Sequence, residues 1–348
     1  MVEAVGMGVI GLGKIGRLHA AHLASGIRGA RLAAVCDTDP ATLAWGAAEF
    51  GAAGFSTPEE LLAQDFVDGV IIASTAETHA VIISAAVHTG KHVFSEKPVA
   101  LTLEETDRAL QQLVDAGLQF QIGFQRRWDA AYVEAKRKIV AGEIGRPLLF
   151  TAHGRDPQFT GDLQDPDKSG GIFLDAAIHD YDAARFLMGD EIARLTAHGA
   201  TLLHERLTAL GDVDTCATIL NFRGGAMGIT EWNRCASYGH DVYAEVLGSE
   251  ATLRIGKLQQ TDVLVLSRSG VTHDTVPWFA ERFAAAYRAE VEAFCAAIRD
   301  TRPASPGVED ARIALSVALR ARDSFHRGES LDVATVEPLT PRGAAISA

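Results

Sequence analysis

An acid and a base stand four residues apart in the segment SGGIFLDAAIHDYDAARFLMG, residues 169–189, where Asp175 precedes His179. Positions four apart lie one helical turn from each other, so both side chains can face one side of a helix. A carboxylate that orients a histidine is the usual arrangement of a general base near neutral pH. The alternative is structural, with Asp175 as a helix N-cap and His179 hydrogen-bonded in the core, and the spacing leaves both open. Asp180 and Asp182 are expected to be the more solvated or structural acids.

A lysine that could complete this chemistry follows an apolar run at residues 91–95, in the order Ser95-Glu96-Lys97-Pro98. Ligands of open α/β sheets bind outside the carboxyl ends of the strands, so Lys97 is placed to point toward a cofactor crevice. Its ammonium group could donate to a substrate oxygen and stabilise the charge that develops there. Glu96 could pair with a nearby base. The alternative is an ordinary surface lysine, and the position alone leaves both open.

A glycine motif lies between a strand-like run and a helical run near the start of the chain, where residues 11–16 read GLGKIG. In a GxGxxG motif the glycines allow a tight turn, close approach of a pyrophosphate and close strand–helix packing, while the helix N-terminus stabilises the anion. The alternative is a turn that needs glycines for its backbone alone. We predict a dinucleotide site here, formed by Gly11, Gly13, Lys14, Ile15 and Gly16.

Asp37 ends the next strand-like run, about 20 residues past Gly16. A carboxylate at this place accepts hydrogen bonds from the adenosine ribose hydroxyls and repels a 2′-phosphate. The neighbouring Thr38 and Asp39 supply no arginine to offset that charge, which favours NAD over NADP. The alternative is that Asp37 only caps the helix that begins at Asp39 or Pro40.

The predicted secondary structure that must position these residues differs between the first third of the chain and the rest. Apolar runs alternate with helical patterns at first, which is typical of βαβ units and a parallel sheet. Asp39 and Thr102 are expected N-caps, and Gly90 and Gly117 are expected helix ends. We predict a doubly wound α/β domain over residues 1–123, with strands at 6–11, 31–36, 68–74, 91–95 and 118–123.

After residue 123 the alternation stops. A charged helix at 130–143, a strand at 147–154 and a loop rich in Asp, Pro and Gly precede the segment that carries Asp175. Strand-like runs then extend from Ile192 to Leu266, and two helices close the chain. This order predicts an α+β domain with a large, mostly antiparallel open sheet over residues 124–335, and a tail at 336–348.

Composition excludes several classes of protein. The 348 residues are 47% hydrophobic and carry a formal net charge of −13. Such a chain lacks the basic footprint of nucleic-acid binders, so we expect no nucleic-acid partner. No apolar stretch reaches the roughly 20 residues of a membrane span, and no secretory signal precedes the first strand. We expect a cytoplasmic, soluble protein with no membrane partner.

Neither cysteine nor histidine spacing favours a metal. The 4 cysteines form no CxxC and are expected to be core residues in a reducing compartment. His153, Asp156, Asp175 and His179 could be drawn as ligands, but HxxD and DxxxH spacings are common by chance and no cysteine joins them. We therefore expect no metal ion.

Further motifs accompany these in a fixed order. The chain reads GLGKIG, VCDTDP, ETH, GKHVFSEKPV, GFQRRWDAAY, RDP, SGGIFLDAAIHDYDAARFLMG and AEVLGS. The series resembles the Gfo/Idh/MocA oxidoreductases, and among them the inositol 2-dehydrogenases, roughly from Gly8 to Asp332. The resemblance implies a Rossmann domain, an open-sheet substrate domain and assembly as a homotetramer through that sheet.

The resemblance also implies oxidation of a secondary alcohol on a polyol ring or sugar with NAD. His179 would take the hydroxyl proton, Asp175 would support it, and Lys97 would hold the reacting oxygen while hydride passes to nicotinamide. The implied cofactor contacts include Thr38, Thr75, His79, Glu96 and Lys97. The implied substrate contacts are Lys97, Arg127, Asp156, Asp175, His179, Tyr238 and His240.

Two positions depart from the family pattern. His240 stands in a YGHD segment where relatives often read YGYD, and Asp156 stands where many relatives carry Asn. Polar changes of this kind decide which hydroxyl pattern a site accepts. We therefore expect a dehydrogenase of myo-inositol or another inositol isomer. The alternatives are a sugar or anhydrosugar dehydrogenase, an NAD-dependent glycosidase, and an NAD-sensing regulator, which would need a basic helix-turn-helix segment that is not visible.

Overall fold

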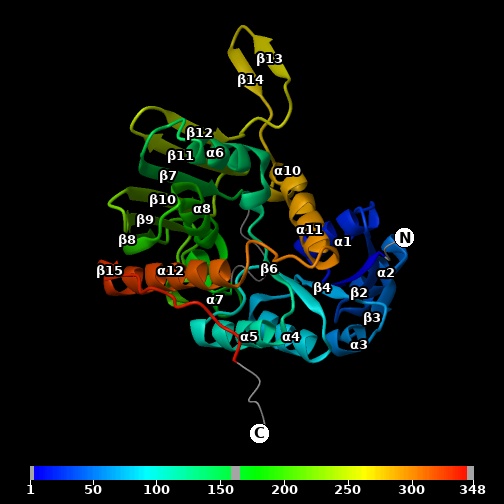
Figure 1. Ribbon diagram of the computed structural model, residues 1–348. Coiled ribbons are helices and arrows are strands. Elements are labelled where there is room, and N and C mark those ends of the chain that lie inside the picture. Colours follow the sequence, from blue (N-terminus) through cyan, green and yellow to red (C-terminus); the bar gives the residue numbers. More distant parts are fainter. Residues whose placement is uncertain (1–3, 158–164, 343–348) are drawn as a thin grey trace. The chain divides into compact units, whose positions relative to one another are not determined.

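The computed structural model describes residues 4–157 and 165–342. The chain divides into two compact units. The first comprises Met1–Gln125, Tyr287–Ile313 and Val336–Ala348, and the second comprises Arg126–Ala286 and Ala314–Thr335. Figure 1 labels the helices and strands of both.

The first unit is built on a six-stranded parallel sheet with the order β3-β2-β1-β4-β5-β6. This is the strand order of doubly wound dinucleotide-binding domains, whose ligands bind where the order reverses, between β1 and β4. The predicted α/β fold is confirmed, with one short strand, β3, that the sequence pattern did not indicate. The strands are β1 Val5–Ile10, β2 Ala30–Cys36, β3 Ala53–Phe55, β4 Gly69–Ile72, β5 His92–Ser95 and β6 Phe120–Ile122.

Local signals fix the ends of the helices between these strands. The side chains of Asp39 and Thr102 each accept a hydrogen bond from the backbone N–H three residues on, so both predicted N-caps are confirmed. Gly117 ends its helix with a φ of 65°, a conformation that favours glycine, and Gly90 lies two residues past the end of another. The helices are α1 Lys14–Ala24, α2 Pro40–Phe50, α3 Pro58–Leu62, α4 Ala76–His88 and α5 Leu103–Ala116.

A helix from the C-terminal part of the chain belongs to the first unit. On α11, Ala284–Arg299, the side chains of Val291, Phe294 and Cys295 are buried in the hydrophobic cluster that contains Val9 and Phe94 of the sheet. Burial of apolar surface stabilises by roughly 25 cal/mol per Å². The structure therefore differs from the contiguous division at 1–123 and 124–335, because the chain returns to the first sheet after residue 286.

The second unit is built on a seven-stranded sheet with the order β12-β11-β7-β10-β9-β8-β15. β10 pairs with β7 in parallel, and the other pairs are antiparallel, which confirms the prediction for this sheet. A separate two-stranded hairpin, β13 Leu264–Ser267 and β14 Gly270–His273, extends from this unit in Figure 1. The sheet strands are β7 Pro147–Arg155, β8 Ile192–Ala200, β9 Thr215–Phe222, β10 Met227–Asn233, β11 Asp241–Gly248, β12 Thr252–Gly256 and β15 Leu331–Asp332.

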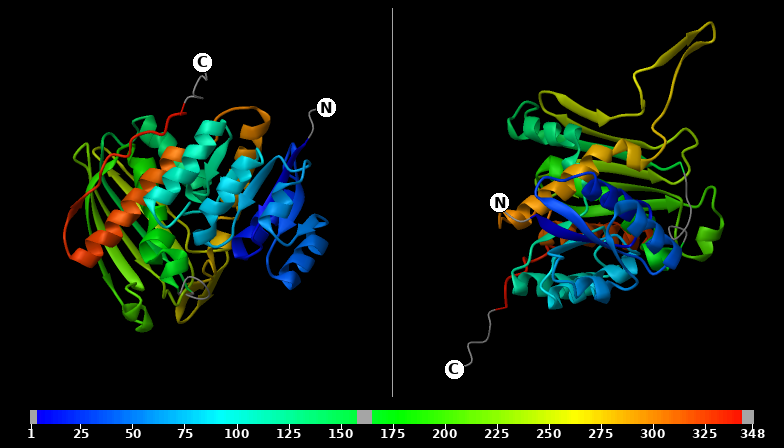
Figure 2. Two further views of the ribbon diagram at one scale, coloured as in Figure 1. Left: turned by 90° about the horizontal axis from the view of Figure 1, so that it is seen from below. Right: turned by 90° about the vertical axis from the view of Figure 1, so that its right-hand side faces the viewer.

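One face of this sheet is covered and the other is open. Every second residue of β9 and β10 is buried, and α8 packs against β7 and β10. The green and yellow strands of this sheet can be followed in the two views of Figure 2. Between the buried residues, Ile219, Met227 and Ile229 keep 42 to 45% of their surface exposed. The remaining helical elements of the described residues are η1 Gln125–Trp128, α6 Ala130–Val140, α7 Pro166–Ser169, η3 Phe173–Ala177, α8 Ile178–Met188, α9 Arg206–Ala209, α10 Phe279–Arg282 and α12 Val308–Arg327.

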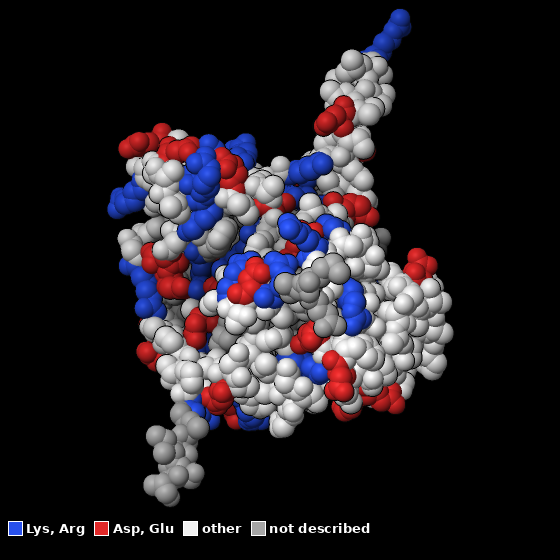
Figure 3. Space-filling model, turned by 45° about the vertical axis from the view of Figure 1, so that its right-hand side comes forward, with Lys and Arg blue, Asp and Glu red and all other residues white. Residues whose placement is uncertain are grey.

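Two properties of the described residues concern membrane-spanning helices and surface charge. Within residues 4–157 and 165–342, no helix combines the length and the apolar character of a membrane span. On the face drawn in Figure 3, Lys and Arg side chains lie interspersed with Asp and Glu side chains.

Candidate active site

The glycine motif forms the turn between β1 and α1. A Cβ on Gly11, where φ is 88°, would lie 2.7 Å from Ser74 N, and a Cβ on Gly16 would lie 1.8 Å from Gly11 O. These two glycines are required by the packing of the turn itself. A Cβ on Gly13 would meet nothing within 4 Å, so its backbone is left open to an approaching group. No side chain caps the N-terminus of α1, which leaves N–H donors for an anion such as a pyrophosphate.

Asp37 links the end of β2 to this turn. Its Oδ2 accepts a hydrogen bond of 2.8 Å from Leu12 N, and its Oδ1 accepts one of 2.9 Å from Asp39 N. The capping alternative is wrong, because the side chain that caps α2 is that of Asp39. Thr38 beside it is exposed. Asp37 therefore stands beside the glycine turn, where dinucleotide-binding domains carry an acidic residue that can accept hydrogen bonds from a ribose.

His79 joins two strand ends of the first unit. Its ring is 1% exposed, with Nδ1 2.8 Å from Pro98 O and Nε2 3.0 Å from Ser74 O. Burial lowers the pKa of His79. The residue therefore holds the Lys97–Pro98 segment, whose peptide bond is cis, against the end of β4. Thr75 precedes α4 as its N-cap residue without a side-chain capping bond.

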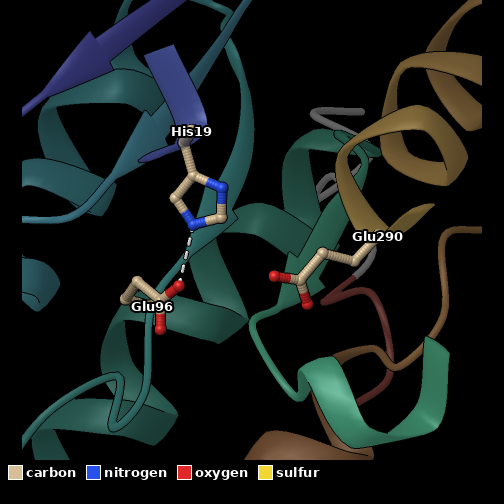
Figure 4. A group of neighbouring side chains, drawn as sticks. All are labelled: His19, Glu96 and Glu290. Atoms are coloured by element: carbon tan, nitrogen blue, oxygen red, sulfur yellow. Dashed lines mark hydrogen bonds and ion pairs between the residues drawn. The ribbon is translucent and has the colours of Figure 1, made fainter. Parts of the chain in front are cut away.

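The sequence prediction that Glu96 pairs with a base is confirmed. Glu96 Oε1 lies 2.9 Å from Nε2 of His19, a residue on the buried side of α1 (Figure 4). Sequence reasoning missed His19, because a histidine in a helix facing the core gives no local signal of its partner. Lys97, the next residue, is half-buried at the carboxyl end of β5.

In the second unit, Asp175 and His179 lie on a helical segment that contains a π turn. The π turn η3 spans Phe173–Ala177 and continues into α8, so Asp175 is not an N-cap and that part of the structural alternative is wrong. Between Gly171 and Arg185, only Asp175 and His179 are not fully buried. π turns inside helices are frequent at functional sites. The segment thus presents one acid and one base on an otherwise buried helix.

Asp175 is held in place by a residue that sequence reasoning missed. Its Oδ2 lies 2.9 Å from Nη2 of Arg234, whose Nη1 lies 3.4 Å from Asp212 Oδ2. Arg234 is 2% exposed and follows β10. No local pattern marks this arginine, because it meets Asp175 only through the folding of the sheet against the helix.

Asp180 and Asp182 are structural, as expected, but they are not solvated. Asp180 is 0% exposed and forms an ion pair with Arg126, while Asp182 is 1% exposed and accepts hydrogen bonds of 2.9 and 2.6 Å from Arg127. Burial raises the pKa of Asp180, and the Arg126 guanidinium opposes that rise. Arg127, a predicted substrate contact, therefore has its Nε and Nη2 committed to Asp182.

The predicted substrate contacts Asp156, His240 and Tyr238 do not all lie together. His240 Nδ1 lies 3.0 Å from Asp156 Oδ1, and the structure brings these two residues together. Tyr238 donates instead to Asp241 and accepts from Arg155, on the rim of a hollow of about 560 Å³ at the ends of β8, β9 and β10. The lining of that hollow includes neither Asp175 nor His179. Of the four residues drawn as metal ligands, His153 lies 3.1 Å from Asp241 and Asp156 lies 3.0 Å from His240.

Comparisons with known proteins cover nearly the whole chain. The model described as oxidoreductase family, NAD-binding Rossmann fold, matches residues 5–124, and that described as oxidoreductase family, C-terminal alpha/beta domain, matches residues 136–333. The scyllo-inositol 2-dehydrogenase (NAD(+)) of Bacillus subtilis is 39% identical over 329 residues, 94% of this chain and 96% of the relative. The myo-inositol 2-dehydrogenase of Thermotoga maritima is 33% identical over 332 residues, 95% of this chain and 99% of the relative.

Solved structures agree with these matches. The scyllo-inositol dehydrogenase from Lactobacillus casei, with bound NAD(H) and scyllo-inositol, has a TM-score of 0.89 at 32% identity, covering 96% of this chain and 100% of that one. An NAD-binding Rossmann domain matched by sequence and by fold makes this protein an NAD-dependent oxidoreductase. The chain belongs to the Gfo/Idh/MocA oxidoreductase family, with the NAD-binding domain first and the C-terminal α/β domain after it.

Proposed function

We propose that this enzyme oxidises a secondary hydroxyl of myo-inositol or another inositol isomer to a ketone with NAD. The observation that supports the chemistry best is the Asp175–His179 pair, left accessible on a buried helical segment and oriented by Arg234. The substrate class is supported by relatives named as inositol dehydrogenases and by a structural neighbour with bound scyllo-inositol.

In this mechanism each side chain has one task. His179 accepts the proton of the hydroxyl as the carbonyl forms, and the Asp175 carboxylate stabilises the imidazolium that results. Arg234, 2.9 Å from Asp175, fixes the orientation of that carboxylate. Lys97 donates to the reacting oxygen and stabilises negative charge on it. A bound NAD would supply the acceptor for the hydride that leaves the carbon.

The turn after β1 fits NAD, since it offers an open backbone at Gly13, an uncapped helix start and the Asp37 carboxylate. We propose that substrate specificity resides in the Asp156–His240 pair together with Arg127 and Tyr238. The full set proposed to hold NAD is Gly11, Gly13, Lys14, Ile15, Gly16, Asp37, Thr38, Thr75, His79, Glu96 and Lys97.

Asp37→Ala is expected to weaken NAD binding by about tenfold to a hundredfold, because a hydrogen bond to a charged group contributes roughly 1.5–3 kcal/mol. The ratio of NADP to NAD affinity should rise, since the charge that repels a 2′-phosphate is removed. Titration calorimetry with both cofactors measures this. Asp37→Asn is the matched control that keeps an acceptor for Leu12 N and removes only the charge, and an unchanged ratio in both variants would refute ribose recognition by Asp37.

Formation of NADH with a panel of inositol isomers, monosaccharides and anhydrosugars tests the substrate class. We expect the highest kcat/KM with an inositol isomer, because the enzyme must hydrogen-bond a ring of hydroxyls and a site built for one hydroxyl rejects an analogue that lacks it. NADH absorbance in parallel reactions with NAD and NADP is the measurement. Release of an aglycone from a glycoside without net NADH would instead favour the glycosidase.

The assembly is proposed to be a homotetramer formed through the open face of the seven-stranded sheet. That face exposes Ile219, Met227, Ile229 and Leu247, each by 41 to 45%. Apolar residues gathered on one sheet face mark an interaction surface. Light scattering should give four times the chain mass of 37.0 kDa, and Ile229→Lys should dissociate the assembly. A monomeric mass for the unaltered protein would contradict the proposal.

A further inference from the structure

Three ionisable side chains meet in the interior of the first unit, outside the proposed catalytic set. His19 comes from α1, Glu96 follows β5 and Glu290 comes from α11, and Figure 4 shows them pointing toward one another. One nitrogen or oxygen atom of each lies within 4.8 Å of those of the other two. His19 and Glu290 are 0% exposed and Glu96 is 9% exposed. The cluster is therefore largely cut off from water.

Hydrogen bonds satisfy only part of this cluster. His19 Nε2 lies 2.9 Å from Glu96 Oε1. Neither carboxyl oxygen of Glu290 has a hydrogen-bond partner among the described residues. Burying a polar group without a partner is costly, and burying a charge without one is far more so. Glu290 thus requires a compensating proton or cation.

The charges of the three side chains do not balance. With both carboxyls ionised, two negative charges face at most one positive charge on His19. The surroundings are apolar: Phe94 lies edge-on to His19 at 5.3 Å and to Phe294 at 5.9 Å. Burial raises the pKa of Glu290 well above its usual range, and the nearby charge of Glu96 raises it further. A proton on Glu290 would remove the excess charge and supply a donor.

The cluster is tied to the chain segment that carries Lys97. Glu96 directly precedes Lys97, and its backbone N–H donates to Ile72 O at 2.9 Å. A Cβ on Gly123 would lie 3.0 Å from Glu96 Oε2, so the glycine leaves room for this carboxyl group. The Glu96 side chain therefore anchors the strand end from the core side, while His79 holds Pro98 O.

We propose that Glu290 is an uncharged carboxylic acid in the folded protein and donates its proton toward Glu96. The Glu96 side chain also contacts His19, and this triad of side chains positions Lys97. Glu290 touches no reacting atom, so it is a positioning residue. The statement about Lys97 rests on the proposed function, whereas the statement about the proton does not.

Infrared spectroscopy tests the proton directly on the full-length protein without substrate. We expect a carbonyl band of a protonated, buried carboxyl at neutral pH that disappears in Glu290→Gln. Glu292→Gln is the matched control, because Glu292 lies on the same helix but is exposed and paired with Arg288. Absence of the band from the unaltered protein, or its persistence in Glu290→Gln, would overturn the proposal.

Kinetics and chemical labelling test the positioning. An amide can donate as a protonated carboxyl does, so Glu290→Gln should keep kcat within about threefold, while Glu290→Leu should lose about tenfold to a hundredfold in kcat with little change in KM for NAD. Lys97 can also be labelled by an amine-reactive reagent and the label read by peptide mass spectrometry, which needs no substrate. The extent of labelling should stay close to that of the unaltered protein in Glu290→Gln and should change in Glu290→Leu. Thermal unfolding verifies that both variants fold.

Each remaining outcome contradicts the proposal in a defined way. If Glu290→Gln loses as much as Glu290→Leu in kcat and in Lys97 labelling, the residue acts as a charge and not as an acid. If Glu290→Leu changes neither, the triad does not position Lys97. One equivalent of a divalent metal in the purified protein, with a lower unfolding temperature after chelation, would show that a cation neutralises the cluster. Failure of the inositol panel alone would leave the infrared and labelling results in force.

Discussion

Replacement of His179 or Lys97 by alanine is expected to lower kcat by orders of magnitude while NAD binding stays largely intact, because His179 is not proposed to hold NAD and Lys97 is only one of the many residues that are. General base catalysis contributes about 10² to 10⁴ in rate, and a donor to the developing oxyanion contributes about 10² to 10³. The proton has no other acceptor in the proposed mechanism, so His179→Ala should show the larger loss. Single-turnover formation of NADH measures the chemical step, and calorimetry measures NAD affinity.

Controls for these two variants come from the same chain. Lys91 begins the segment that leads to Lys97 and donates to Gln64 O at 2.9 Å, so Lys91→Ala removes a lysine nearby without touching the proposed chemistry. It should keep nearly full turnover. Retention of most of the rate by His179→Ala or Lys97→Ala would refute the corresponding role, even if the substrate is an inositol.

Removal of the guanidinium partner of Asp180 is expected to produce the largest loss of stability. Arg126 and Asp180 have side chains that are 3% and 0% exposed, and they form one ion pair. Deleting one partner of such a pair costs about 3–5 kcal/mol, because the other charge is left buried without compensation. Arg126→Met should lower the free energy of unfolding by that amount, as measured by urea denaturation at pH 7.

Two further measurements test the Arg126–Asp180 pair: the pH dependence of the stability of Arg126→Met, and the stability of the variant in which both residues are replaced. Burial already raises the pKa of Asp180, and loss of the opposing Arg126 charge should raise it further above the unfolded value. The folded protein then binds the extra proton, so the deficit in stability should shrink as pH falls. Arg126→Met with Asp180→Leu should recover much of the stability, since apolar residues often replace a buried pair at little cost. Arg108→Met, at an exposed pair with Glu104, should change little. An Arg126→Met variant as stable as the parent would show that the pair contributes no net stability.

Contacts close along the chain account for the features that could be predicted from the amino-acid order. The glycine motif, the caps at Asp39 and Thr102 and the alternation of strands and helices all follow from backbone conformation and apolar spacing within a few residues. The same holds for the DxxxH segment, because an acid and a base four residues apart share one side of any helix.

Packing between distant segments selects the partners of these residues. Arg234 reaches Asp175 across 59 positions of sequence, and Glu290 reaches the Glu96–His19 pair from a helix assigned by sequence to the other domain. The amino-acid order cannot tell which arginine is buried against which aspartate, because no local pattern distinguishes one such pairing from another. The π turn before α8 and the parallel pairing of β7 with β10 were also invisible in the sequence, since both depend on how helix and sheet pack. Local chemistry thus indicated the groups that we propose to react, and tertiary packing supplied the partners that hold them.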